Sequence, residues 1–137
     1  MDLIIQPCSD LHFEAVRACI KEFELDNRQL EQHEFLIALY NNKLAGFGRI
    51  REHNNCSEMC SLGIVAPARS KGIGKKLVKA LAQKARQDLF LVCIIPGYFA
   101  ELGFYETKEY PAAIKNKLDY CTDNLPVHEK YVVMKMM

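Results

Sequence analysis

The chain has 137 residues, 50% of them hydrophobic, and a formal net charge of +1 at pH 7. This length and apolar content suit one domain, residues 1–137, and the near-neutral charge excludes a general attraction to nucleic acid or membranes. No run of about 18 apolar residues and no basic, cleavable leader occurs, so neither a membrane span nor a signal peptide is expected.

The six cysteines lie within apolar runs, and their spacing matches no zinc pattern. We therefore expect no metal site, and we expect buried, reduced thiols in a cytoplasmic protein rather than the disulfide framework of a secreted one. The cysteines are Cys8, Cys19, Cys56, Cys60, Cys93 and Cys121.

The N-terminal half predicts a strand, a helix and three further strands. Residues 2–7 favour a strand, and Ser9 or Asp10 can cap a helix that runs to about Leu25. The polar residues 26–32 indicate a short helix or a loop. Two β-rich runs, 34–40 and 44–51, flank the turn signal Asn41-Asn42-Lys43 and predict a hairpin, and residues 56–65 predict the next strand.

A basic, glycine-containing turn follows this strand and opens directly into an amphipathic helix that runs to about Arg86. Its core is Arg69-x-x-Gly72-x-Gly74, with lysines around it. Glycine lets the backbone approach a ligand closely, and the unpaired N–H groups and dipole of a helix N-terminus favour an anion. Strand, turn and helix together predict a pyrophosphate cradle, although the spacing matches neither the nucleoside-triphosphate nor the dinucleotide loop.

The C-terminal half alternates strands and helices. Residues 89–95 form an apolar run typical of a strand buried on both faces. Pro96-Gly97 ends this run and starts a short helix that reaches Gly103, and residues 104–110 predict another strand. A helix from Pro111 to about Tyr120, a loop over 124–129 and a last strand over 131–136 complete an α/β order with a mixed sheet.

Three motifs together resemble the GNAT superfamily of N-acetyltransferases. The turn resembles the acetyl-CoA-binding motif of that family, and Leu62-Gly63-Ile64 precedes it like the family's L-a-V strand. Phe99-Ala-Glu-Leu-Gly103-Phe104 resembles its later F-x-x-x-G-F element. Residues 109–121 and Val132-Val-Met134 are similar to the C-terminal part of small stand-alone amino-acid acetyltransferases, of the N-acetylglutamate synthase and arsenic-resistance type.

The resemblance implies a GNAT-like α/β fold, in which a mixed β-sheet flanked by helices splays between strands 56–65 and 89–95. It also implies acetyl-CoA as co-substrate, with its pantetheine arm in this opening. We expect Leu62, Ile64 and Val65 to contact the arm through their backbone. The full set of cofactor-binding residues implied is Leu62, Ile64, Val65, Arg69, Ser70, Lys71, Gly72, Ile73, Gly74, Lys75 and Phe99.

Glu58 is the candidate general base, because many relatives carry a glutamate at this position that deprotonates the amine. The two-residue period of a strand predicts that Glu58, Cys60, Leu62 and Ile64 share one face. The alternative is an exposed glutamate near a strand end.

The general acid is left open by the sequence. Phe99 stands where many relatives carry a tyrosine, and it has no proton to donate. Tyr98 and Tyr105 are the candidate acids, with water or substrate as alternatives. The irregular start after Pro96-Gly97 can turn Tyr98 toward the sheet opening, so we expect Tyr98 to matter more; alternatively, Tyr98 only packs beside the cofactor.

The predicted function is acetyl transfer to the primary amine of a small molecule, with an amino acid favoured, by direct attack in a ternary complex. Arg49 and Arg51 are candidate partners of a substrate carboxylate, since a guanidinium pairs bidentately with it; the alternative is a solvated strand face, and Lys115 and Lys117 are predicted to be surface charges. A protein or peptide acetyltransferase and a non-catalytic acyl-CoA-binding module are the other functions considered. A homodimer is left open.

Overall fold

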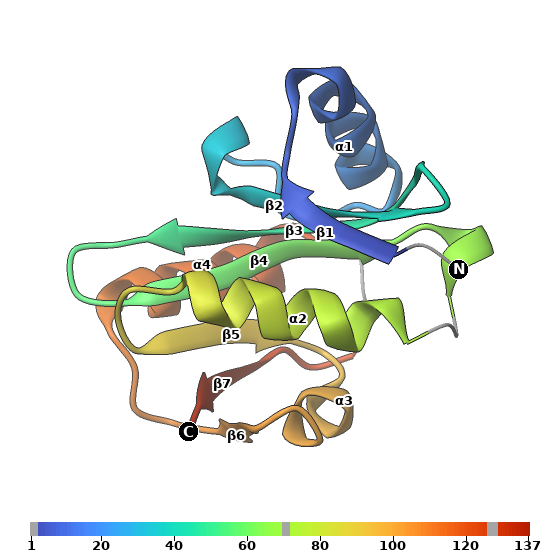
Figure 1. The fold of residues 1–137 in the computed structure, drawn as a ribbon. Helices are drawn as coiled ribbons and strands as arrows, with labels where there is room; N and C mark the ends of the chain where they lie inside the picture. The colour runs from blue at the N-terminus through green and yellow to red at the C-terminus, as the bar shows by residue number, and fades with distance from the viewer. Residues whose placement is uncertain (1–2, 70–71, 126–128) are drawn as a thin grey trace.

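A computed structural model describes residues 3–69, 72–125 and 129–137. It contains seven strands in one sheet and four α-helices (Figure 1). The elements are β1 (Leu3–Pro7), α1 (Asp10–Glu22), β2 (Phe35–Tyr40), β3 (Lys43–Glu52), β4 (Ser57–Ile64), α2 (Ile73–Lys84), β5 (Leu89–Cys93), α3 (Pro96–Ala100), β6 (Phe104–Glu106), α4 (Ala112–Asn124) and β7 (Val132–Met136), with single 3-10 turns at Gln32–Glu34 and Ala66–Ala68.

The strands lie in the order β1-β2-β3-β4-β5-β7-β6, and β4 and β5 are the parallel pair among antiparallel neighbours. Figure 1 shows α2 crossing in front of the sheet and α4 lying behind it. The apolar side chains of α2 pack with those of β4, β5 and α3 in one core cluster, while those of α1 pack against β2 and β3 in another. The predicted α/β fold with a mixed sheet is confirmed.

Local sequence signals account for most of the elements. The hairpin between β2 and β3 turns through Asn41 and Asn42, whose φ angles of 51° and 68° are the left-handed values that asparagine tolerates. Residues 26–31 form no helix, and the turn at Gln32–Glu34 is the helical piece there. The strand predicted over 104–110 ends at Glu106, whereas the following helix extends to Asn124.

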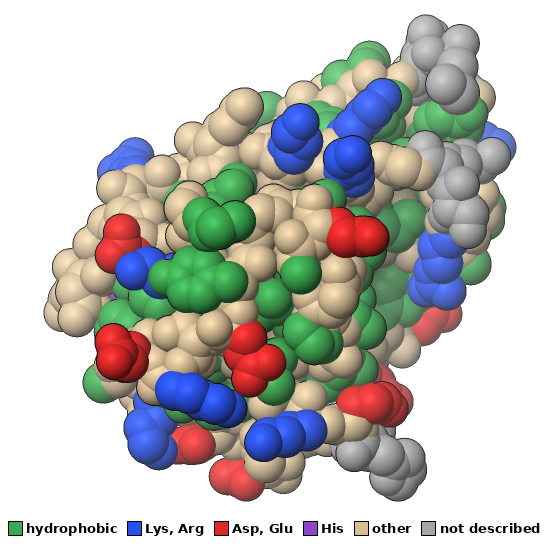
Figure 2. Space-filling model, turned by 90° about the horizontal axis from the view of Figure 1, so that it is seen from below, with side chains coloured by type: hydrophobic (Ala, Val, Ile, Leu, Met, Phe, Trp, Pro, Cys, Tyr) green, Lys and Arg blue, Asp and Glu red, His purple; other side chains and the backbone are tan. Residues whose placement is uncertain are grey.

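The surface carries charges of both signs, and the cysteines form no disulfide. On the face shown in Figure 2, basic and acidic side chains are interspersed among apolar ones. All six cysteines are free, and all but Cys19 are buried. Among the described residues, no helix combines the length and apolarity that a membrane crossing requires.

A β-bulge in β4 changes which side chains share a face. Gly46 pairs with Ile64 and Arg49 pairs with Cys60, so β4 has one more residue than β3 over this stretch. The bulge lies at Ser61, whose φ is 53°. After a bulge the alternation of side chains reverses relative to an unbroken strand.

The predicted common face of β4 is therefore wrong. Leu62 and Ile64 pack toward α2, together with Met59 from before the bulge. Glu58 and Cys60 lie on the opposite face, where α4 packs, and Glu58 contacts Lys117 of that helix. Leu62 and Ile64 thus lie on one side of the sheet, and the carboxylate of Glu58 lies on the other.

The sheet opens between β4 and β5, as predicted. Their ladder joins Ser57 to Leu89, Glu58 to Phe90 and Met59 to Leu91, and in the described part of the chain it ends there. From Cys60 onward the edge of β4 that faces β5 pairs with no strand among the described residues. Backbone N–H and C=O groups left unpaired in this way need another partner.

Candidate functional site

A cavity of about 780 Å³ occupies the opening between β4 and β5. One end lies at the glycine turn and the start of α2, and the other lies between α4 and the loop that follows α1. The residues that line the first end include Leu62, Ile64, Arg69, Gly72, Ile73, Gly74, Lys75, Ile95, Tyr98 and Phe99; those at the second end include Leu25, Asp26, Cys60, Lys117, Cys121, Leu125 and Tyr131.

The glycine turn and the start of α2 form the first end of the cavity. Gly72 caps α2 with φ 75°, a left-handed conformation that costs other residues about 1–2 kcal/mol. A Cβ on Gly74 would lie 2.6 Å from the Tyr98 hydroxyl oxygen. Arg69 fastens the turn to the end of β4, because its Nε donates to the Ile64 carbonyl oxygen at 2.9 Å. The predicted contacts of Ser70 and Lys71 fall outside the described residues.

Val65 was predicted, like Leu62 and Ile64, to contact the cofactor through its backbone, but its backbone lies in a different environment. Leu62 and Ile64 line the cavity, but Val65 is not among its described lining residues. The Val65 N–H donates to the Ala45 carbonyl at 2.8 Å, and its own carbonyl accepts from the Ala68 N–H at 2.9 Å. The backbone of Val65 is thus occupied within the protein, which argues against its predicted role.

The aromatic residues after β5 lie where the sequence predicted, with one exception. Tyr98 and Phe99 both line the cavity and pack edge to face, with ring centroids 5.1 Å apart. Burial raises the pKa of the Tyr98 phenol. Tyr105 lies on β6, at the far edge of the sheet, is 43% exposed, and is absent from the described cavity lining. Its position argues against the predicted role as acid.

Glu58 is buried, so the alternative of an exposed glutamate at a strand end is wrong. Its side chain is 1% exposed, and its Oε1 lies 2.8 Å from Nε2 of His53. Among the buried side-chain oxygen and nitrogen atoms of the described residues, Oε2 of Glu58 is the one that lacks a hydrogen bond. Burial raises the pKa of this carboxyl, but His53 and the charge of Lys117 outweigh burial and hold the pKa below its usual value.

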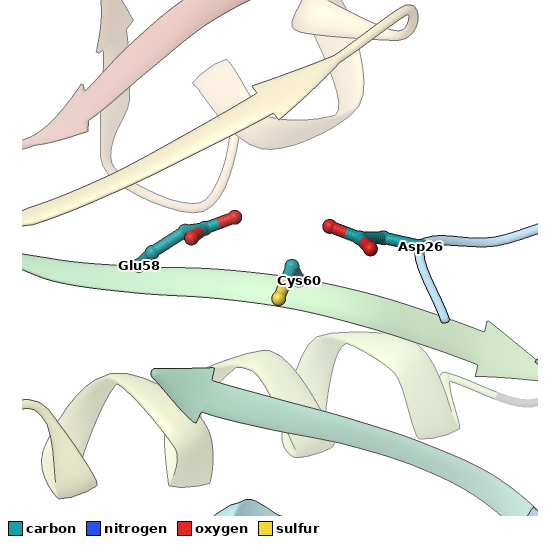
Figure 3. A group of neighbouring side chains, drawn as sticks. All are labelled: Asp26, Glu58 and Cys60. Carbon is teal, nitrogen blue, oxygen red and sulfur yellow. The ribbon is translucent and has the colours of Figure 1, made fainter. Parts of the chain in front are cut away.

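Asp26 and Lys117 form a buried ion pair beside Glu58. Lys117 Nζ donates to Asp26 Oδ2 at 2.7 Å and lies 3.4 Å from Glu58 Oε2. Figure 3 shows the carboxylates of Asp26 and Glu58 pointing toward one another, with Cys60 between them. The prediction that Lys117 is a surface charge is wrong, since its side chain is 5% exposed.

The pKa values of this pair follow from the same contacts. Burial would raise the pKa of the Asp26 carboxyl, but hydrogen bonds from Arg28 and the charge of Lys117 hold it well below its usual range. Burial would lower the pKa of the Lys117 ammonium, but the acidic groups around it, Cys60, Glu58 and Asp26, raise it above its usual range. Both groups therefore carry their charges at neutral pH.

The same cluster is poorly suited to a metal ion. Asp26, Glu58 and Cys60 place ligand atoms within 4.8 Å of one another. However, the ammonium of Lys117 already contacts both carboxylates, and its positive charge would repel a metal cation. Burial also raises the pKa of the Cys60 thiol to about 11, and a protonated thiol is a weak metal ligand.

Arg49 is a structural residue rather than an open carboxylate partner. It is fully buried, and its guanidinium donates to Ser61 Oγ, to the carbonyl oxygens of Arg28 and Gln29, and to Glu34 Oε1, at 2.9–3.1 Å. These contacts argue against its predicted role. Arg51 is more accessible, and its Nη2 donates to Gln29 Oε1 at 2.7 Å.

Three residues at the second end of the cavity were missed by the sequence analysis: Asp26, Lys117 and Tyr131. A signal for Lys117 existed, because Ile114, Lys117 and Cys121 have the spacing of one helix face, and all three are buried. Nothing local distinguishes Asp26. Burial raises the pKa of the Tyr131 phenol, and this ring lies close enough to Cys121 and Lys117 to interact with them electrostatically.

A family model described as "Acetyltransferase (GNAT) family" matches residues 5–108. No curated protein matches the chain in sequence.

Several solved structures share the fold. N-acetylglutamate synthase from Neisseria gonorrhoeae, complexed with coenzyme A and N-acetyl-glutamate, matches with a TM-score of 0.77 and 19% identity, and the match covers 100% of this chain but 36% of that one. Rv2747 from Mycobacterium tuberculosis, in complex with CoA and NLQ, matches with a TM-score of 0.79 and 17% identity over 98% of both chains. Naa50 from Arabidopsis thaliana, in complex with the bisubstrate analogue CoA-Ac-MVNAL, matches with a TM-score of 0.69 and 16% identity over 100% of both chains.

Arg49→Met is expected to lower the free energy of unfolding by about 3–5 kcal/mol, because it leaves Glu34 and two carbonyl oxygens without their buried partner. Arg51→Met is the matched control and should cost less than about 1 kcal/mol, since its partner is a partly exposed amide. Denaturant unfolding of both variants measures the difference. An Arg49→Met protein of unchanged stability but weakened amino-acid binding would instead restore the predicted substrate role.

Proposed function

The chain belongs to the acetyltransferase (GNAT) family, and we propose that it transfers an acetyl group from acetyl-CoA to the primary amine of a small molecule, with an amino acid favoured. The observation that supports this most is the cavity between β4 and β5, which has the glycine turn at one end and Lys117 in the wall of the other. Glu58 is not among the described lining residues, but its Oε2, which has no hydrogen bond within the described part of the chain, lies 3.4 Å from Nζ of Lys117. Solved structures of similar fold contain coenzyme A, and the acetylglutamate complex contains an acetylated amino acid.

The first end of the cavity suits the pyrophosphate and pantetheine of acetyl-CoA. The N-terminus of α2 offers unpaired N–H groups to a phosphate, and Arg69 and Lys75 add positive charge. The unpaired edge of β4 beyond Met59 can bond the amides of the arm. Phe99 supplies an apolar wall.

Chemistry is proposed for the second end of the cavity. Acetyl-CoA supplies the acetyl group as a thioester and leaves as a thiol. The acceptor nitrogen attacks the carbonyl carbon, so that an N–C bond forms and the C–S bond breaks. Glu58 Oε2, which lacks a hydrogen bond within the described part of the chain, accepts the proton that the amine releases. The backbone of β4 beyond Met59, which pairs with no described residue of β5, can offer an N–H to the carbonyl oxygen.

Tyr131 is the better placed of the phenols to protonate the departing sulfur. The sulfur is bonded to the carbon that the amine attacks, so the acid must lie near Glu58. Tyr131 lies at that end, near Lys117, whereas the Tyr98 hydroxyl lies against Gly74 in the cradle. We therefore propose Tyr98 as a cofactor contact and Tyr131 as the acid.

The charges around the second end balance, because the cations Arg28, Arg49, Arg51 and Lys117 accompany the carboxylates of Glu24, Asp26, Glu34 and Glu58. Arg51 is the cation whose side chain donates to an amide oxygen rather than to a carboxylate, so it is the candidate partner for the carboxylate of an amino-acid acceptor. The acetylated amino acid in the N-acetylglutamate synthase complex supports the same kind of acceptor. A peptide N-terminus is the second candidate acceptor, since the similar fold of Naa50 is complexed with a peptide-bearing analogue.

The proposed activity is tested by thiol release from acetyl-CoA with a panel of amino acids, simple amines and peptides. We expect turnover with one or more amino acids and less with the matching amines that lack the carboxylate. Preference for peptides would support the second candidate. Tight acetyl-CoA binding without turnover of any acceptor would indicate a non-catalytic module instead.

Gly74→Val should weaken acetyl-CoA binding about tenfold or more, equivalent to about 1.4 kcal/mol, because its side chain enters the cradle beside Tyr98. The fold should tolerate the change, since the obstructing atom is at the end of a partly exposed side chain. Gly97→Ala is the control, because a Cβ there meets nothing within 4 Å. Calorimetric titration measures both, and unchanged affinity in Gly74→Val would contradict the cradle assignment.

Glu58→Gln should lower kcat/KM at neutral pH by about 10²–10⁴-fold, the usual size of general acid–base catalysis. Acetyl-CoA affinity should change little, since Glu58 lies on the face of β4 away from Leu62 and Ile64. Steady-state kinetics and calorimetry separate the two effects. Full activity in this variant would remove Glu58 from the mechanism.

Tyr131→Phe should lower kcat by about tenfold or more, a loss of about 1.4 kcal/mol of barrier stabilisation. Tyr98→Phe should instead raise KM for acetyl-CoA, because its hydroxyl lies at the cradle. Tyr105→Phe, at the far edge of the sheet, should remain within about twofold of wild type. A larger loss of kcat in Tyr98→Phe than in Tyr131→Phe would reverse the two assignments.

A further inference from the structure

Glu58 has two oxygens in different situations, although it lies almost wholly inside the protein. Oε1 is hydrogen-bonded to His53, whereas Oε2 has no hydrogen bond to any described residue and lies 3.4 Å from the ammonium nitrogen of Lys117. A carboxylate that is buried without partners takes up a proton rather than remain charged. Its charge must therefore be held by the groups that surround it.

Lys117 is itself held in place by a second carboxylate. Its Nζ donates to Asp26 Oδ2 at 2.7 Å, across 91 residues of sequence. Asp26 is fixed in turn by Arg28, whose backbone N–H, Nε and Nη2 all donate to it at 2.9–3.0 Å. The ammonium is thus held closer to Asp26 than to Glu58, and Oε2 has no hydrogen bond within the described part of the chain.

His53 is hydrogen-bonded to the other oxygen of Glu58, Oε1. It lies in the turn between β3 and β4, where its N–H donates to the Cys56 carbonyl at 2.8 Å and its carbonyl accepts from Gln87 Nε2 at 2.8 Å. Its ring is 21% exposed, while Glu58 is 1% exposed. The imidazole therefore joins a buried carboxylate to the solvent side of the protein.

We propose that Lys117 and His53 are positioning residues for Glu58, which hold its carboxylate charged from two sides and leave Oε2 free to bond the acceptor amine. The proposal rests on the proposed function, in which Glu58 receives the proton of the amine. Under this proposal α4, which is distant in sequence from the glycine turn, helps to set the protonation state of Glu58.

The other charged and titratable groups around Glu58 are weaker candidates for this part. Arg51 faces it from β3 and is bonded to Gln29, and Arg28 is paired with Asp26. Cys60 and Cys121 are thiols whose burial raises their pKa, so they remain neutral. The Asp26 carboxylate repels Glu58, and Lys117 offsets this repulsion by lying between the two.

The first test is the pH profile of kcat/KM in Lys117→Met. Loss of the ammonium removes an opposite charge that favours ionised Glu58, so the acid limb should move upward by about one pH unit or more. Lys115→Met is the matched control on the same helix, because its ion pair with Asp119 is exposed. Acid limbs that coincide in wild type, Lys115→Met and Lys117→Met would overturn the proposal.

If Lys117→Met does not fold, a second variant tests the proposal. The double change Asp26→Asn/Lys117→Met removes one charge of each sign, and its acid limb should also move upward, by less, because the repulsion from Asp26 disappears as well. His53→Leu should shift the limb in the same direction, and His53→Gln, whose amide can still donate, should restore part of the shift.

A readout without turnover separates this proposal from the proposed function. Carbon NMR of labelled glutamate carboxyls follows the titration of Glu58 directly, and Glu58→Gln identifies its signal. The midpoint should rise in Lys117→Met and in His53→Leu but not in Lys115→Met. If no acceptor is acetylated but these midpoints move, the proposed function fails and the positioning roles stand; unmoved midpoints in an active enzyme would overturn the positioning roles alone.

Discussion

Strands β4 and β5 are parallel neighbours that stop pairing after three residues, and the cavity follows from this early separation. A parallel ladder that ended later would fill the opening with interstrand hydrogen bonds and leave no free backbone for a ligand. The bulge at Ser61 adds to the effect, because it turns the remaining part of β4 relative to the part that carries Glu58. As a result, β4 has apolar side chains on one face and the buried carboxylate of Glu58 on the other, next to an edge that β5 leaves unpaired.

The carboxylate end of the cavity depends on charges that the fold brings together from distant segments. Asp26 comes from a loop, Glu58 from a strand and Lys117 from a helix, and each is nearly inaccessible to solvent. Burying any one of them alone would cost several kcal/mol. The pairing of opposite charges keeps all three ionised, and the direction of their pKa shifts implies that this part of the site changes little over the middle of the pH range.

The conformation of the glycine turn could be predicted from the sequence, because its signals are local. A strand, two glycines and an amphipathic helix follow one another directly, and Gly72 indeed has the positive φ that the turn requires. The bulge was missed, although Gly63 in the same strand is a weak signal for an irregular strand, and the alternation rule therefore placed Leu62 and Ile64 on the wrong face. Lys117 was misjudged for a different reason: the charge of a lysine suggests exposure, and only the position of Asp26, fixed by the tertiary fold, makes its burial tolerable.

The segment from Asp26 to Gln29 has no helix or strand of its own, and the sheet holds it through side chains. Arg49 bonds the carbonyl oxygens of Arg28 and Gln29, and Ser61 bonds that of Asp26. The backbone of this loop is thus fixed by the side chains of Arg49 and Ser61, and Ser61 also lines the cavity. Loss of either side chain would leave carbonyl oxygens of residues 26–29 without their partners, so the position of the Asp26 carboxylate depends on the same buried hydrogen bonds that join this loop to the sheet.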